Sequence, residues 1–161
     1  MSHHWATFVE LIATPFEHAS LVWGIVPLYF GLVVNELTSD KANYRTALQT
    51  GFSFLWAGAQ WLFAYWQPRH EIEGMPAINL LVTSLVMVCG IAALISGFRR
   101  RFPRYARFLG HTRFANYFMI TLFPIQAHYL PWTWERLIAM ALFAVPVWLV
   151  LHFGLMPVRG R

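Results

Sequence analysis

The stretch PAINLLVTSLVMVCGIAALISGF, residues 76–98, decides the fold of this 161-residue chain. It contains no acidic or basic side chain. The hydrocarbon core of a bilayer is about 30 Å thick, so a helix needs roughly 20 apolar residues to cross it. Residues 76–98 therefore predict a transmembrane helix.

Four further segments have the same character on either side of this stretch, at residues 19–37, 47–66, 114–130 and 137–156. The chain is 58% hydrophobic and only 12% charged, whereas charged residues make up about a quarter of a soluble domain. We therefore expect an all-α fold in which residues 1–161 form a single integral membrane domain with five transmembrane helices. Segment 114–130 is short and carries Asn116, Gln126 and His128, so four spans plus a re-entrant segment is the alternative.

An amphipathic helix is predicted at residues 1–16, before the first span. Trp5, Phe8, Ile12 and Phe16 recur at steps of three or four residues. Pro15 is expected to end this helix. We expect it to lie flat in the outer membrane interface with its apolar face toward the acyl chains, or to pack on the other helices of the chain.

The positive charges predict the orientation of the spans. If five helices alternate in direction, ten of the twelve Lys and Arg residues fall on one side. These ten are Lys41, Arg45, Arg99, Arg100, Arg101, Arg104, Arg107, Arg113, Arg159 and Arg161. Lys and Arg are retained in the cytoplasm, so the N-terminus is expected outside and the C-terminus inside, in a membrane of the bacterial inner-membrane type.

The densest positive charge follows residues 76–98 and comprises Arg99, Arg100, Arg101, Arg104 and Arg107. Anionic headgroups attract such residues by about 1 kcal/mol each, so contact with anionic lipids is expected. A docking surface for an acidic cytoplasmic partner is the sharper alternative. The position beside a membrane segment argues against nucleic acid as the partner.

Polar side chains inside the spans are the main candidates for a functional site, because each needs a partner or water. Gln49, Ser53 and Gln60 fall on one stripe of the second span, which is expected to face protein. Asn79, Asn116 and Gln126 are the expected partners on the third and fourth spans. This set predicts either interhelical hydrogen bonds or the lining of a solute path.

Histidines raise the alternative of a haem or metal site. In the expected topology His111 and His152 lie near the inner boundary, and His18, His70 and His128 lie near the outer one. A bis-histidine haem needs two imidazoles at one depth on facing helices, and imidazoles with nearby carboxylates suit zinc, copper or iron. Haem is not favoured, because His18, His70 and His111 lie at or beyond the ends of the spans. The spacing does not support a metal site either, because no two of the outer histidines repeat at three or four residues on one helix. Cys89, the single cysteine, excludes a disulfide framework or a thiolate cluster within the chain.

Three functions therefore follow from the sequence. The leading hypothesis is an accessory or scaffolding subunit of a larger membrane complex, bound to other membrane subunits or to a second copy, because the bundle carries no catalytic signature. The alternative is a small-solute or ion carrier or channel, and the third is a haem- or metal-binding electron-transfer protein. An enzyme is not expected, since no nucleophile or oxyanion arrangement accompanies the histidines.

Overall fold

The computed structural model describes residues 2–38, 44–66, 76–99 and 113–157. These residues form six α-helices and, within the described ranges, no strand. The helices are α1 (Ser2–Glu17), α2 (Ala19–Thr38), α3 (Tyr44–Trp66), α4 (Pro76–Phe98), α6 (Arg113–Gln126) and α7 (Trp134–Leu155). The all-helical prediction is confirmed, and the predicted segments agree with the helices to within a few residues except at the end of α6.

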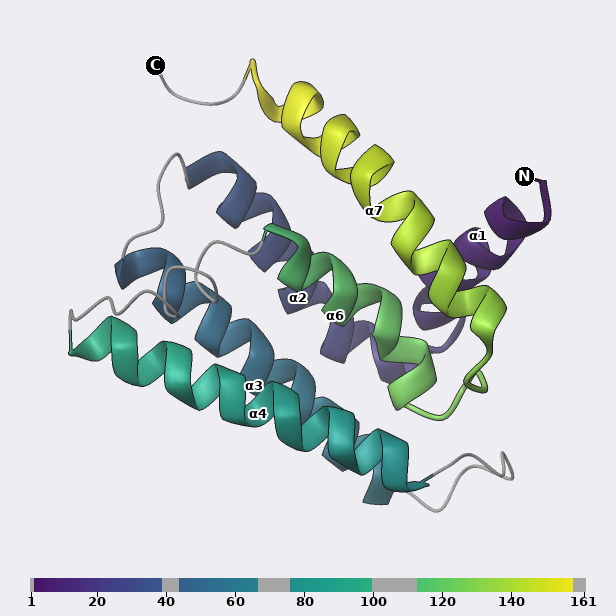
Figure 1. Ribbon diagram of the computed structural model, residues 1–161, viewed down its shortest axis with the longest axis horizontal. Helices are drawn as coiled ribbons and strands as arrows, with labels where there is room; N and C mark the ends of the chain where they lie inside the picture. The colour runs from purple at the N-terminus through teal and green to yellow at the C-terminus, as the bar shows by residue number, and fades with distance from the viewer. Residues whose placement is uncertain (1, 39–43, 67–75, 100–112, 158–161) are drawn as a thin grey trace.

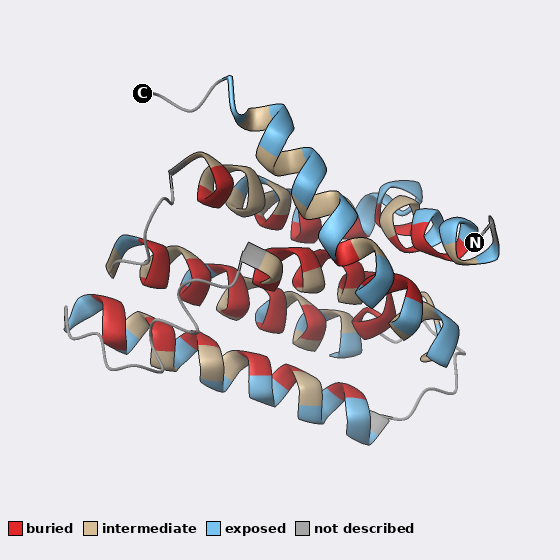
Figure 2. Cartoon of the chain, turned by 45° about the horizontal axis from the view of Figure 1, so that its top comes forward, coloured by how far each residue is buried: buried red, intermediate tan, exposed pale blue. Residues whose placement is uncertain are grey.

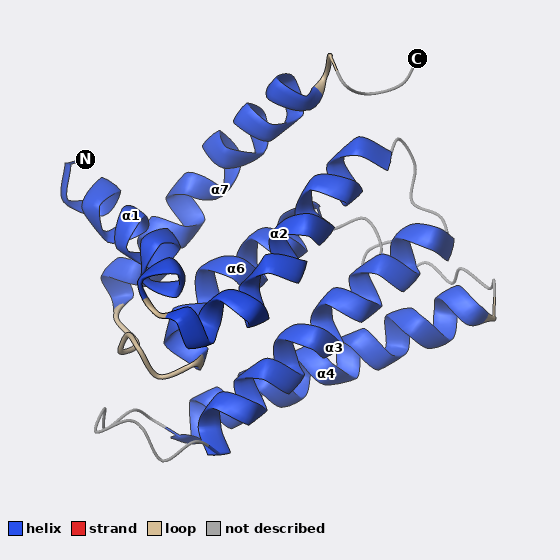
Figure 3. Cartoon of the chain, turned by 180° about the vertical axis from the view of Figure 1, so that it is seen from behind, coloured by secondary structure: helices blue, strands red, loops and turns tan. Residues whose placement is uncertain are grey.

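The helices stack in layers (Figures 1 and 3). The antiparallel pair of α3 and α4 forms one layer, α2 and α6 form the next, and α7 lies beyond them with α1 across it. One end of the bundle contains the starts of α2, α4 and α7 and is named here the Tyr129 end. The opposite end contains the ends of those helices and is named the Glu36 end.

Small residues bring α3 and α4 close together along their length. A Cβ atom added to Gly51 would lie 2.9 Å from the carbonyl oxygen of Gly90, and one added to Gly97 would lie 3.1 Å from that of Tyr44. Glycine lets two membrane helices approach at backbone distance, where dispersion contacts are strongest. This close approach explains why the contact between α3 and α4 is the most extensive among the described helices.

Helix α6 lies at the centre of the bundle and contacts α1, α2, α3 and α7. From Ala115 to Ala127 every residue except Phe118 and Leu122 is buried. The exposed residues gather instead on the outer sides of helices such as α4 and α7 (Figure 2). A helix enclosed in this way meets protein on all sides and can carry polar side chains without exposing them to lipid.

Three of the described helices are long and apolar enough to cross a membrane: Ala19–Leu37 of α2, Ala77–Phe98 of α4 and Trp134–Leu155 of α7. This finding indicates membrane association, but it corrects the expectation of five such segments. Helix α3 has 23 residues, yet its polar stripe lowers its mean hydropathy. Helix α6 has 14 residues, a length of about 21 Å, and ends at Gln126 instead of reaching residue 130.

Helix α1 runs to Glu17, so Pro15 does not end it, and the helix crosses α7 (Figures 1 and 3). Its face with Thr7, Leu11 and Thr14 is buried. The apolar face predicted from the sequence is divided: Trp5 and Phe16 are 55% and 53% exposed, whereas Phe8 is 7% exposed and stacks on Phe143 of α7. This face therefore packs on the bundle at Phe8 and points outward at Trp5 and Phe16.

Candidate functional site

Helices α2, α3 and α6 meet at a polar group inside the bundle, which we call the Ser53 layer. It consists of Gly31, Ser53 and Asn116. A Cβ atom added to Gly31 would lie 3.0 Å from Ser53 Oγ and 3.4 Å from Asn116 Nδ2. Ser53 and Asn116 are each 4% exposed. The missing side chain at Gly31 thus lets α2 approach a hydroxyl and a carboxamide directly.

A second group, the Gln60 layer, lies two helical turns closer to the Tyr129 end. A Cβ atom added to Gly24 would lie 3.2 Å from Gln60 Oε1 and 2.5 Å from Phe123 Cζ. The indole N–H of Trp56 donates to the carbonyl oxygen of Gly24 at 2.8 Å. On each of the three helices the two layers are seven residues apart, about 10 Å along the axis. The rings and glycines of this layer pack tightly, and Phe123 is 2% exposed.

Several buried polar atoms of the central helices have no hydrogen-bond partner among the described residues. They are Tyr29 Oη of α2, Gln49 Oε1 and Trp61 Nε1 of α3, and Asn116 Oδ1 and Gln126 Nε2 of α6. Buried polar atoms are almost always paired with protein or water, because an unpaired one costs a few kcal/mol. The central helices therefore have unused hydrogen-bonding capacity at several depths, and at Asn116 it belongs to the Ser53 layer.

The Tyr129 end holds a polar cluster that joins α4 to α6. Thr83 Oγ1 donates to Gln126 Oε1 at 3.4 Å. The Asn79 amide nitrogen lies 3.2 Å from His128 Nε2, and Asn79 Oδ1 accepts from the indole N–H of Trp132. Of the six polar residues singled out from the sequence, the structure brings Ser53 to Asn116 and places Gln60, Asn79 and Gln126 toward this end. Gln49 lies on α3 closer to the Glu36 end.

The turn after α6 positions this cluster. His128 has φ 60°, in the left-handed region that usually requires glycine or asparagine. The backbone N–H of Tyr129 donates to the Pro124 carbonyl at 2.9 Å, closing the helix end. The turn places Tyr129 Oη 2.9 Å from Ser20 Oγ of α2.

A pocket opens at the same end, next to the Gln60 layer. Its lining residues are Ser20, Leu21, Gln60, Phe63, Ala64, Phe123 and Tyr129. Hydroxyl and carboxamide groups thus share this pocket with aromatic rings. Phe123 belongs both to the pocket wall and to the packed layer below it.

At the Glu36 end a carboxylate is buried inside α2, a feature not singled out from the sequence. Glu36 is 4% exposed, and its Oε1 lies 2.8 Å from His152 Nδ1 of α7. A second pocket adjoins Glu36 and is otherwise lined by Leu32, Phe114, Tyr117, Ala144, Val147, Trp148 and Leu151. The signal that could have pointed to this site is the acidic residue within the predicted span 19–37, because such residues are costly in a membrane.

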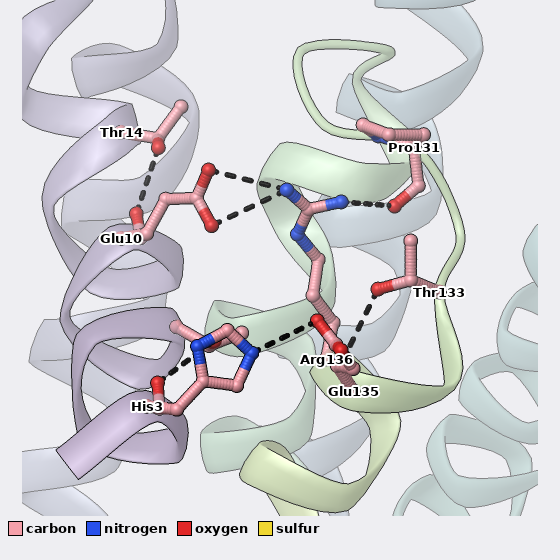
Figure 4. Close-up of polar contacts among 8 residues, drawn as sticks. His3, Glu10, Thr14, Pro131, Thr133, Glu135 and Arg136 are labelled. Atoms are coloured by element: carbon pink, nitrogen blue, oxygen red, sulfur yellow. Dashed lines mark hydrogen bonds and ion pairs between the residues drawn. The ribbon is translucent and has the colours of Figure 1, made fainter.

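Charged contacts attach α1 to the start of α7 (Figure 4). Arg136 Nη2 donates to both carboxylate oxygens of Glu10 at 3.1 and 3.2 Å, and Nη1 donates to the Pro131 carbonyl at 2.8 Å. Thr133 caps α7 by accepting from the backbone N–H of Arg136. His3 and Glu135 pair 3.2 Å apart, but both side chains are mostly exposed. We regard this junction as the attachment of α1 and not as a reactive site.

The described histidines lie at separate places. His18 packs on the Tyr129 ring, His128 lies against Asn79 and Tyr65, and His152 pairs with Glu36. Among the residues that the structure describes, no group of three His, Cys, Asp or Glu side chains is placed to hold a metal ion. His70 and His111 lie outside the described residues, as do Arg100, Arg101, Arg104 and Arg107. Arg99 is exposed just after α4.

In comparisons with known proteins, no family model, no curated protein and no solved structure matches this chain.

Proposed function

We propose that this chain is a small carrier or channel that crosses a membrane with five helices, namely α2, α3, α4, α6 and α7. Helix α3 supports this architecture because it is as long as α4 and packs along it. Helix α6 supports it because its polar residues face protein on all sides. Together with the turn that follows it, α6 lies along α2 from the pocket at Glu36 to Ser20. These two residues of α2 are about 24 Å apart along the helix axis.

The proposed orientation follows the positive charges. The Glu36 end faces the cytoplasm of a bacterial inner membrane, because the segments at that end carry ten of the twelve Lys and Arg residues. The arginines that follow α4 then contact anionic headgroups. Helix α1 lies along the outer surface, with Trp5, Val9 and Phe16 toward the acyl chains.

The observation that carries the proposed function is the set of buried polar atoms without a partner on α3 and α6, at several depths between the two ends of the bundle. Gln49 Oε1 and Trp61 Nε1 are twelve residues apart on α3, about 18 Å along its axis. Asn116 Oδ1 is another such atom beside α2 and α3, and Gln126 Nε2 lies where α6 meets α4. A purely structural core would pair these atoms, whereas a solute path needs them for the passing molecule.

Phe123 is the proposed gate of this path. Its ring and the Gln60 carboxamide both pack against Gly24, and the ring also forms part of the pocket at the Tyr129 end. A rotation of this ring would connect the pocket with the Ser53 layer. The path is therefore closed in the conformation that the structure describes.

The test is solute entry into liposomes that contain the purified chain. A panel of small charged and uncharged solutes is offered, and at least one should enter faster than in protein-free liposomes. Gln60→Leu should reduce that rate to the protein-free value, because it replaces the carboxamide at the gate with an apolar side chain. The matched control is Ser84→Leu, since Ser84 is exposed on α4.

Circular dichroism and gel filtration show whether each variant is folded. Entry of no solute, or equal entry through the wild-type chain and a folded Gln60→Leu variant, would contradict the proposed function.

A role as an accessory or scaffolding subunit is the second candidate. The observation that favours it is the bonding of interior polar residues between helices, as in Thr83 with Gln126 and Tyr117 with the Met140 carbonyl, which stabilises a rigid bundle. Extraction in mild detergent at native expression tests this candidate. A stoichiometric set of membrane partners should travel with the chain, and a chain that migrates alone would rule the role out.

A further inference from the structure

Resting on the proposed carrier or channel function, we infer that the solute is small, uncharged and equipped with both hydrogen-bond donors and acceptors. Water, small alcohols and amides such as urea belong to this class. The inference comes from the chemical identity of the unpaired atoms and their order along the path.

The unpaired atoms include both kinds of hydrogen-bonding group. Gln49 Oε1 and Asn116 Oδ1 are acceptors, and they lie on the half of the path toward the Glu36 end. Trp61 Nε1 and Gln126 Nε2 are donors, and they lie toward the Tyr129 end. A solute that both donates and accepts can bond at every one of these positions.

A simple ion matches these groups less well than an uncharged solute does. Three of these four unpaired atoms belong to carboxamides and the fourth to an indole, and none of these groups carries a charge that would offset that of an ion. An ion also needs several ligands or an opposite charge to replace its hydration shell. The two layers contribute hydroxyl, carboxamide and indole groups, while Glu36, which bonds to His152, adjoins the separate pocket beside α7.

The Ser53 layer is the place on the proposed path where α2, α3 and α6 bring polar groups together, and we assign recognition of the solute to it. Asn116 is 4% exposed and retains an unpaired oxygen, and its amide nitrogen and Ser53 Oγ converge on Gly31. A carboxamide presents an acceptor and a donor group together, as does urea. Because these groups pack closely around Gly31, the inferred solute is a molecule of a few heavy atoms.

The experiment uses the full chain in liposomes with urea, glycerol, K⁺ and Cl⁻ as probes. Urea and glycerol entry is followed by stopped-flow light scattering, and the ions by entrapped indicator dyes. We expect urea and glycerol to enter severalfold faster than in protein-free liposomes and the ions to remain at the protein-free rate. Phe123→Leu should increase urea entry further, because a smaller side chain leaves the gate partly open.

Asn116→Leu should return urea entry to the protein-free rate, since it keeps the volume and removes the carboxamide. Ser53→Ala is the second variant and should lower urea entry at least partly, with Ser84→Leu again unchanged. Folded variants that conduct urea like the wild-type chain would overturn the assignment of this layer.

The outcomes distinguish a wrong solute class from a wrong carrier or channel function. Faster entry of K⁺ or Cl⁻, with urea and glycerol at the protein-free rate, overturns the inference and leaves a carrier or channel in place. No entry of any probe through the wild-type chain and Phe123→Leu overturns both.

Discussion

Glu36 is the residue whose environment departs most from what a membrane helix tolerates. Its carboxylate lies within a span of α2, is 4% exposed and bonds to His152 of α7. The sequence shows the acid inside the span, but the imidazole is 116 residues away along the chain. Only the packing of α2 against α7 brings the two together, which is why the pair was not predicted.

Replacing Glu36 with Ala should destabilise the protein, because His152 then loses a charge-assisted hydrogen bond in a largely apolar pocket. We expect a loss of about 1–3 kcal/mol, measured as a lower midpoint of thermal unfolding in detergent. Glu135→Ala is the matched control, since the Glu135 and His3 side chains are 62% and 68% exposed and such pairs contribute about 0–1 kcal/mol. Equal losses of stability in the two variants would show that the buried pair of Glu36 and His152 contributes no more than the exposed pair of Glu135 and His3.

At the scale of the elements, hydropathy predicts the helices that face lipid better than those inside the bundle. Residues 76–98 coincide with α4, and 19–37 fall within α2. The prediction fails at α6, which is shorter than expected and buried nearly all round. A high apolar content is typical of a helix that faces lipid. The sequence of a helix surrounded by protein depends more on close packing and on hydrogen bonds to its neighbours.

Replacing glycine with alanine should change the stability in opposite directions at two glycines, one in the contact between α3 and α4 and one on α7. Alanine normally stabilises a helix by about 1 kcal/mol relative to glycine. At Gly51, however, the added Cβ would lie 2.9 Å from a Gly90 backbone oxygen, so Gly51→Ala should lower the stability by about 1–3 kcal/mol. Gly154 has nothing within 4 Å, so Gly154→Ala should leave the stability unchanged or raise it.

Thermal unfolding in detergent measures both variants under the same conditions. A stable Gly51→Ala protein would mean that α3 and α4 do not approach at backbone distance.

For the whole molecule, the number of membrane crossings determines on which side each terminus lies. Five crossings would place the termini on opposite sides of the membrane and the positive charges at the Glu36 end. Only three of the described helices meet the hydropathy criterion, so hydropathy alone does not count α3 and α6 as crossings. Under the proposed five-helix topology both would count as crossings, since α3 packs on α4 and α6 packs on α2.

Cysteine labelling tests the crossing number. In a Cys89→Ser background, Ser2→Cys should react with a membrane-impermeant maleimide added from outside, and Arg161→Cys should react only after the membrane is opened. Labelling of both ends from the same side would exclude an odd number of crossings.

The sequence by itself determined that the chain is helical, that much of it is apolar enough for lipid, and where most helices begin and end. Those properties depend on local composition and on a helical period that any reader of the chain can count. Only the tertiary structure decided that α6 lies in the centre, that Gly24 and Gly31 admit Gln60, Ser53 and Asn116 to one interface, and that Glu36 meets His152. Contacts between residues far apart in the sequence depend on which helix faces pack together. In lipid, that packing is determined by the shapes of the faces and by their hydrogen-bonding groups more than by hydrophobicity.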